Sequence, residues 1–200
     1  MGKEIRSTLE IALEKAEKIG KASKEELELE KIKEQAKKLA AKFMENQKVN
    51  LKEELISLTI DKSDIFKKAA FKSALEVFLK NIVLPRGESQ LQNAKIALQG
   101  IKSLFQNVPE VEKLCAEVER LLKEYYQNLF TIYEELKKRL AAGVEDLEKV
   151  LSEQMGAQVK VSIENHPQFK EEWQKIKERL DQEYGRPLEY FKNLFEKLIP

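Results

Sequence analysis

The stretch that decides the fold runs from Pro109 to Leu140 and reads PEVEKLCAEVERLLKEYYQNLFTIYEELKKRL. Its apolar side chains recur at alternating steps of four and three residues, which places them on one face of a helix. That seam consists of Val111, Cys115, Val118, Leu122, Tyr125, Leu129, Ile132 and Leu136. At about 1.5 Å per residue the helix is a rod of roughly 48 Å, longer than a compact domain is wide. The pattern therefore predicts an elongated helical protein.

The same helix is expected to continue beyond Leu140. Gly143 resembles a C-cap, yet the apolar positions that follow it stay in phase with the seam. A lone glycine inside a helix costs about 1 kcal/mol, which a packed apolar stripe can offset. We therefore expect a central helix over residues 109–142, and we favour its continuation to about residue 155 with a bend at Gly143.

The rest of the chain also reads as helices. The stretch from Ile65 to Leu84 is the most apolar, and only a narrow charged strip is left for water, so we expect an inner helix there. Gly185 and Pro187 predict a break between the last two helices. Further apolar stripes with helical spacing cover residues 5–19, 29–43, 51–58, 91–105, 169–184 and 188–198.

The sequence does not decide the local structure of three stretches. The stripes on either side of Gly20 are out of phase, which fits either a kink or one gently supercoiled helix. Residues 56–60 alternate like a strand but also fit a short helix. Residues 158–164 carry the clearest strand alternation in the chain. Because a lone strand is not viable and no second strand is convincing, we favour an extended connector over 158–164.

These elements predict an all-α fold, namely an elongated, mostly antiparallel multi-helix bundle of coiled-coil character with one long central helix. Two hundred residues can bury about 70% of the surface of the unfolded chain, so one core is sufficient. We expect a single helical domain over 1–200. A subdivision into N-terminal helices (1–47) and a main bundle (50–200) is the alternative.

The composition of the chain limits the classes of function that it can have. The 36 Lys and Arg residues balance 35 Asp and Glu residues, so no global field attracts the chain to nucleic acid or to an anionic membrane. Charged residues make up 36% of the chain against a usual quarter, which fits slender solvated helices and is also a habit of thermophile proteins. Without an apolar run of signal-peptide or membrane-spanning length, a cytoplasmic location is expected.

Residues for catalysis or metal binding are scarce. Cys115 is the only cysteine and lies on the central seam, where a small buried hydrophobe is expected. His166 is the only histidine, and Pro167 beside it favours a structural role at a helix start. One Cys and one His exclude the usual four-ligand zinc sites, and no glycine pair has phosphate-loop spacing. We therefore expect no catalytic, cofactor-binding or metal-binding residue.

Two surface features suggest binding. A basic strip, composed of Lys67, Lys68, Lys72, Lys80 and Arg86, could meet phosphates, although a solvated helix face is the simpler interpretation. Near the C-terminus, apolar residues cover a wide arc, which suits either docking onto the chain's own bundle or an interaction face. The candidate residues of that face are Trp173, Tyr190, Phe191, Leu194, Phe195 and Leu198.

The sequence thus favours a non-enzymatic helical interaction or scaffold protein whose partner is another protein or a second copy of itself. Binding of nucleic acid or an anionic membrane surface through the basic strip is the alternative. An enzyme with an unrecognised carboxylate site is a second alternative. No cofactor is expected, and these residues do not identify a known family.

Overall fold

The computed structural model describes residues 24–156 and 162–199, and this part of the chain is helical without a strand. The elements are α2 (Lys24–Glu45), α3 (Leu51–Leu58), α4 (Asp64–Asn81), α5 (Glu88–Leu104), α6 (Pro109–Met155), the 3₁₀ turn η1 (Ile163–Asn165) and α7 (Pro167–Glu196). The predicted all-α fold with a long central helix is confirmed. Within these described stretches no helix has the length and apolarity needed to span a membrane.

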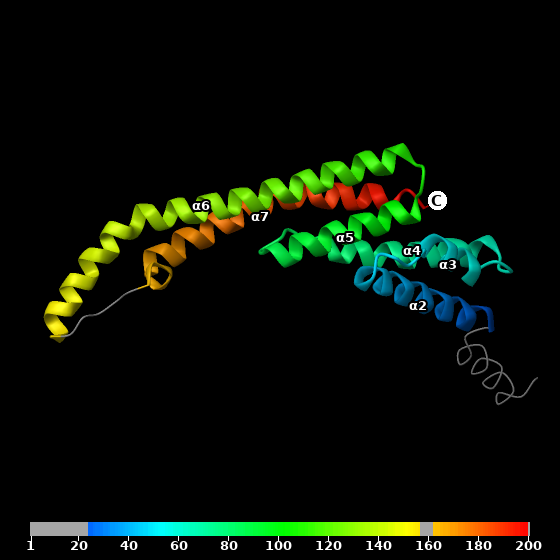
Figure 1. The fold of residues 1–200 in the computed structure, drawn as a ribbon, viewed down its shortest axis with the longest axis horizontal. Helices are drawn as coiled ribbons and strands as arrows, with labels where there is room; N and C mark the ends of the chain where they lie inside the picture. The colour runs from blue at the N-terminus through cyan, green and yellow to red at the C-terminus, as the bar shows by residue number, and fades with distance from the viewer. Residues whose placement is uncertain (1–23, 157–161, 200) are drawn as a thin grey trace, which may run out of the picture.

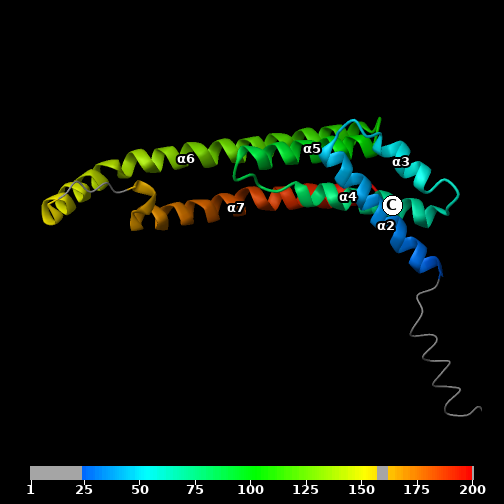
Figure 2. The same cartoon turned by 60° about the horizontal axis from the view of Figure 1, so that its bottom comes forward.

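The molecule is elongated and has two parts (Figures 1 and 2). The body consists of α2–α5 packed with the first half of α6 and the second half of α7. The arm is the antiparallel hairpin that the rest of α6 and α7 form. The main hydrophobic core fills the body and includes Leu122 and Phe195, whereas a separate small cluster of Tyr125, Leu129 and Leu180 holds the arm together.

The residues at the two ends of α6, as well as its apolar seam, explain where this long helix begins and ends. Pro109 occupies the first turn, where its missing N–H costs nothing. Glu110 and Glu112 lie in the same turn, where their negative charge is favourable beside the positive end of the helix dipole. The helix then runs through Gly143 and ends at Gly156, whose φ of 64° is the left-handed conformation that glycine readily adopts. Continuation to Met155 is therefore confirmed. Figure 1 shows that the last turns of α6 curve away from the line of the first ones.

The inner helix α4 is shorter than the pattern predicted, because it ends at Asn81 rather than Leu84. Pro85 disfavours helical conformation at the residue before it, so the last apolar residues become extended. Ile82 is still fully buried in that extended conformation. Apolar character therefore predicted the burial of Ile82 correctly, whereas Val83 is 40% exposed and the helical conformation expected for residues 82–84 is wrong.

The predicted break near the C-terminus is also wrong, since α7 is one helix with Gly185 and Pro187 inside it. A proline within a helix costs about 3 kcal/mol through a lost hydrogen bond and a steric clash. Both sides of this turn are anchored: the Tyr184 ring packs on Tyr125, and Leu188 is buried in the main core. We attribute the continuity of α7 to this packing.

The remaining open stretches are partly settled. Residues 51–58 form a helix, as the capping pattern favoured. The surroundings of Gly20 and most of the 158–164 stretch lie outside the described residues, and the part from Ser162 onward contains no strand. Helix α2 packs along α4 within the main core, where the Phe43 and Phe78 rings meet edge to face at 5.9 Å. The N-terminal helix described here thus shares its core with the bundle.

Gly100 on α5 allows α5 to lie directly against α4. A Cβ atom added at Gly100 would overlap the ring of Phe78, which is fully buried. We expect Gly100→Ala to lower the free energy of unfolding by about 1–3 kcal/mol, the usual cost of overpacking a core. Urea denaturation followed by circular dichroism measures this.

The matched control is Gly185→Ala, because an added Cβ there meets no atom within 4 Å. Relief of the entropic cost of a helical glycine should raise the stability of that variant by about 0.5–1 kcal/mol. Equal effects of the two substitutions would contradict the close approach of α4 and α5.

Candidate functional site

Aromatic side chains gather on one side of the arm, where the start of α7 meets the middle of α6. The Tyr133 ring contacts the Phe169 ring at 5.5 Å and the Trp173 ring at 5.1 Å, both edge to face. Phe169 is buried, whereas Tyr133 and Trp173 are half-buried. Two further rings lie one and two turns earlier on α6. We call the whole set the aromatic site: Tyr126, Phe130, Tyr133, Phe169 and Trp173.

Two surface pockets lie at this site, and Tyr133 and Trp173 line both of them. The first, the apolar pocket, has a volume of about 240 Å³ and is lined by Arg86, Tyr126, Leu129, Phe130, Tyr133 and Trp173. The second, the basic pocket, has a volume of about 330 Å³ and is lined by Tyr133, Glu164, Phe169, Lys170, Trp173, Gln174 and Lys177. Phe130 has 62% of its surface exposed, which is unusual for so large an apolar ring.

The turn before α7 is tied to α6 at this site by Glu164. Its carboxylate accepts a hydrogen bond from Lys137 Nζ at 2.8 Å and one from the Tyr133 hydroxyl at 3.2 Å. The Ser162 hydroxyl also donates to it. The bond from Lys137 is the main cause that lowers the pKa of Glu164 to about 2, so this carboxylate is ionised near neutral pH.

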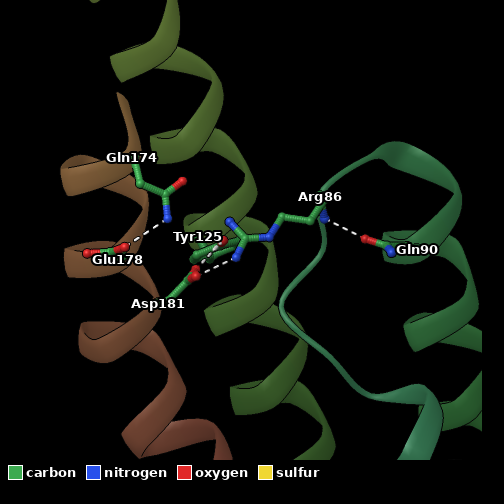
Figure 3. A network of polar contacts seen from close by, with 6 residues as sticks. All are labelled: Arg86, Gln90, Tyr125, Gln174, Glu178 and Asp181. Carbon is green, nitrogen blue, oxygen red and sulfur yellow. Dashed lines mark hydrogen bonds and ion pairs between the residues drawn. The ribbon is translucent and has the colours of Figure 1, made fainter. Parts of the chain in front are cut away.

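A second polar connection holds the arm to the body (Figure 3). Arg86, on the loop between α4 and α5, forms an ion pair with Asp181 on α7. The Tyr125 hydroxyl on α6 donates to the other carboxylate oxygen at 2.8 Å, and the guanidinium lies 5.7 Å from the centre of the Tyr125 ring. Burial, followed by the bond to Asp181, raises the pKa of Tyr125. One carboxylate thus joins three segments that are distant in sequence.

The basic pocket has an excess of positive charge. Lys170 and Lys177 line it, and neither forms an ion pair with any residue in 24–156 or 162–199. The only carboxylate in its lining, Glu164, is already held by Lys137. Gln174, between the two lysines, donates to Glu178 at 2.8 Å (Figure 3). The pocket therefore combines an aromatic wall with two ammonium groups free to meet an anion.

The predicted basic strip is only partly assembled. Lys68, Lys72 and Lys80 are exposed on α4 and form no ion pair within the described residues. Lys67 lies 3.5 Å from the carboxylate of Asp64. Arg86 does not continue the strip, because Asp181 draws its guanidinium to α7.

The predicted interaction face is divided by the fold. Phe195 is fully buried in the main core, and Phe191 and Leu198 pack against that core. Leu194 is half-buried, while Tyr190 has 61% of its surface exposed. Of the six candidates, only Trp173 lies at the aromatic site, so the C-terminal residues dock mainly onto their own bundle.

Sequence reasoning missed four members of the aromatic site, although a signal was present. Tyr126, Phe130 and Tyr133 each follow a seam position by one residue and form a second aromatic row with helical spacing. Phe169 and Trp173 have the same spacing on α7. One neighbouring helix cannot bury both a complete apolar seam and an aromatic row beside it. The presence of both on α6 would have indicated a second contact surface.

The sequence offered Cys115 and His166 as the residues to examine for metal binding or catalysis. The described residues hold no group of three or more side chains suited to a metal ion. Cys115 is fully buried, and burial raises the pKa of its thiol to about 12, so it is not a nucleophile near neutral pH. His166 precedes the first turn of α7 with its Nδ1 atom buried and without a hydrogen-bond partner in the described residues.

The placement of the C-terminal aromatics is tested by a pair of charge substitutions. Phe195→Glu should lower the free energy of unfolding by at least about 3 kcal/mol, because it removes a buried ring and desolvates a carboxylate. Tyr190→Glu, at an exposed position of the same helix, should change stability by no more than about 0.5 kcal/mol. Urea titration of both variants measures their free energies of unfolding. If Phe195→Glu lowered stability as little as Tyr190→Glu, the burial of Phe195 would be contradicted.

The lowered pKa of Glu164 predicts how the start of α7 responds to acid. The stabilising contact is present in full above pH 4.5, the usual carboxyl pKa, and is lost as the pH falls toward 2. The protection of residues 163–170 against hydrogen exchange, expressed relative to the intrinsic exchange rate at each pH, should therefore fall over that range, as measured by mass spectrometry. Glu164→Gln, which cannot ionise, should exchange fast at neutral pH and lose this pH dependence; an unchanged profile would contradict the assignment.

Of the three comparisons with known proteins, one gave a match. Residues 59–197 match a family of unknown function (DUF6657), and this region includes α4, α5, α6 and α7 and hence the whole aromatic site. The searches of curated proteins and of solved structures gave no match. Because the match extends over more than half of the 200 residues, the chain belongs to the DUF6657 family.

Proposed function

We propose that this protein is a non-enzymatic scaffold that holds an amphipathic helix of a protein partner at the aromatic site. The observation that carries the proposal is the exposure of Phe130 beside the apolar pocket, which Trp173 and Arg86 also line. Trp, Tyr and Arg dominate the residues that supply most of the binding energy in protein interfaces. An apolar side chain of the partner would fill the pocket against these rings.

The site is built to bind without large rearrangement. Tyr133 is held by Phe169 and Trp173 on one side and by Glu164 on the other. Arg86 is held by Asp181. Since these side chains are ordered before binding, association costs less conformational entropy than it would on a mobile surface.

The architecture supports a scaffold role as well. The main core lies in the body, whereas most of the aromatic site lies on the arm: Trp173 packs against the small cluster around Tyr125, and only Tyr126 packs against the main core. A partner bound there would be held at a set distance from whatever contacts the body.

Site-specific photocrosslinking in the native cells tests this proposal. Benzoylphenylalanine at position 130 should give a discrete covalent adduct, identified by mass spectrometry, because that ring lies at the proposed docking surface. The same residue at position 190 is the matched control, since Tyr190 is equally exposed at 61% but lies away from the pocket lining.

Trp173→Ala should weaken the adduct at position 130 at least tenfold, as expected for loss of an aromatic anchor worth about 2 kcal/mol or more. Circular dichroism of that variant checks that the fold is intact. No adduct at position 130, or equal adducts at 130 and 190, would contradict the proposal.

A further inference from the structure

Two lysines of α7 lie at the aromatic site, and neither has an acidic partner among residues 24–156 and 162–199. Lys170 and Lys177 are seven residues apart, so both project from the same face of α7, roughly 10.5 Å apart along its axis. Both line the basic pocket. Trp173, between them in sequence, lines this pocket and the apolar pocket alike. Positive charge therefore lies directly beside the proposed contact for an apolar side chain.

The carboxylates next to Lys170 in sequence are paired with other cations. Glu171 forms an ion pair with Lys175 at 2.6 Å, one turn further along α7. Glu172 forms an ion pair with Arg139 of α6. The ammonium group of Lys170, an exposed residue, is therefore left for a group outside the chain.

The carboxylates near Lys177 are engaged in the same way (Figure 3). Glu178 accepts a hydrogen bond from the Gln174 amide at 2.8 Å. Asp181, one turn after Lys177, forms an ion pair with Arg86. Neither carboxylate lies within ion-pair distance of the Lys177 ammonium group.

Glu164 is the one carboxylate among the described residues that line the basic pocket. It accepts hydrogen bonds from Lys137 at 2.8 Å and from the Tyr133 hydroxyl at 3.2 Å, both on α6. Its charge is thereby matched by Lys137 and does not compensate the two lysines of α7. The pocket keeps two uncompensated positive charges beside its aromatic wall.

We infer that the partner helix has an acidic edge, in which two Asp or Glu residues two turns apart pair with Lys170 and Lys177. The inference rests on the proposed function, because it specifies the partner of the same aromatic site. Residues i and i+7 of any α-helix are separated by the same roughly 10.5 Å as the two lysines. A helix lying along α7 can therefore meet both ammonium groups while an apolar side chain between its acidic residues contacts Trp173.

Exposed charges of this kind decide which partner binds more than how tightly it binds. An acidic edge is attracted to the two lysines during encounter, whereas a basic edge is repelled. The aromatic pockets supply most of the binding energy, because ion pairs in contact with water contribute little each. Since salt screens such pairs, the preference for an acidic helix should shrink as ionic strength rises.

Nucleic acid is the other polymer that could bring negative charge to this surface. Single strands bind in grooves that combine aromatic side chains with positive charge along the whole backbone. At this site Lys137, Arg139 and Arg86 are already paired with carboxylates, and the net charge of the chain is only +1. Two isolated positive charges fit a helix with a few acidic residues better than they fit a polyanion.

Fluorescence titration of the full chain tests the acidic edge, because Trp173 is the only tryptophan and lies at the site. The probes are three synthetic amphipathic helices of about 18 residues, which share one leucine stripe. They differ only at edge positions spaced by seven residues, which carry glutamate, glutamine or lysine. The glutamate peptide should change the Trp173 emission at a concentration about threefold lower than the glutamine peptide requires, and the lysine peptide should bind most weakly.

A charge swap distinguishes lost binding from lost folding. In the double variant Lys170→Glu with Lys177→Glu the order of the peptides should reverse, so that the lysine peptide binds about fivefold more tightly than the glutamate peptide. A variant that had merely unfolded would bind neither.

The matched control is Lys68→Glu with Lys72→Glu, which changes the net charge by the same amount. Both lysines are exposed on α4, form no ion pair within the described part of the chain and lie outside both pockets. This variant should keep the peptide order of the unmodified chain.

The outcomes separate this inference from the proposed function. Equal affinities for the three peptides, no response of Trp173 to any of them, or an unchanged order in the Lys170 and Lys177 variant would each overturn the acidic edge. Tighter binding of an oligothymidylate than of the glutamate peptide would also overturn it, in favour of nucleic acid. Photocrosslinking at position 130 decides the proposed function separately, since an adduct there would leave that proposal standing with a partner that has no acidic edge.

Discussion

Burial of one apolar seam along α6 is the constraint on which the rest of the structure depends. The same stripe packs on α5 in the body and on α7 in the arm, so a single helix belongs to two hydrophobic clusters. Tyr125 marks the transition between them. Its ring is fully buried in the arm cluster, and its hydroxyl bonds Asp181, the residue that also holds Arg86 of the body. Arm and body, which already share the continuous helices α6 and α7, are also tied together at this point by packing and by charge.

The aromatic site is a consequence of that arrangement. Once the seam faces α7, the aromatic row that follows it by one residue must lie at the edge of the helix pair, where one neighbour cannot cover it. Tyr133 is covered by Phe169 and Trp173, but Phe130 is left largely exposed. Covering it would take a partner, because an exposed aromatic ring next to a pocket gains by burial.

The unequal lengths of α6 and α7 produce the second unusual feature. Arg139 on α6 pairs with Glu172 near the start of α7, and α6 continues past that point to Met155.

The sequence alone determined the all-α class, the long central helix and the burial of its seam, because these depend on local periodicity and on the apolar content of single helices. It failed where distant contacts decide the outcome. Packing of Tyr184 and Leu188 holds α7 continuous through Pro187, and the main core takes up Phe195, a candidate for an exposed face. Arg86 was grouped with lysines near it in sequence, but Asp181, 95 residues away, fixes its position. Which aromatic side chains stay exposed depends on where α7 starts along α6, and only the tertiary structure decides that register, since many alignments of two apolar stripes bury similar area.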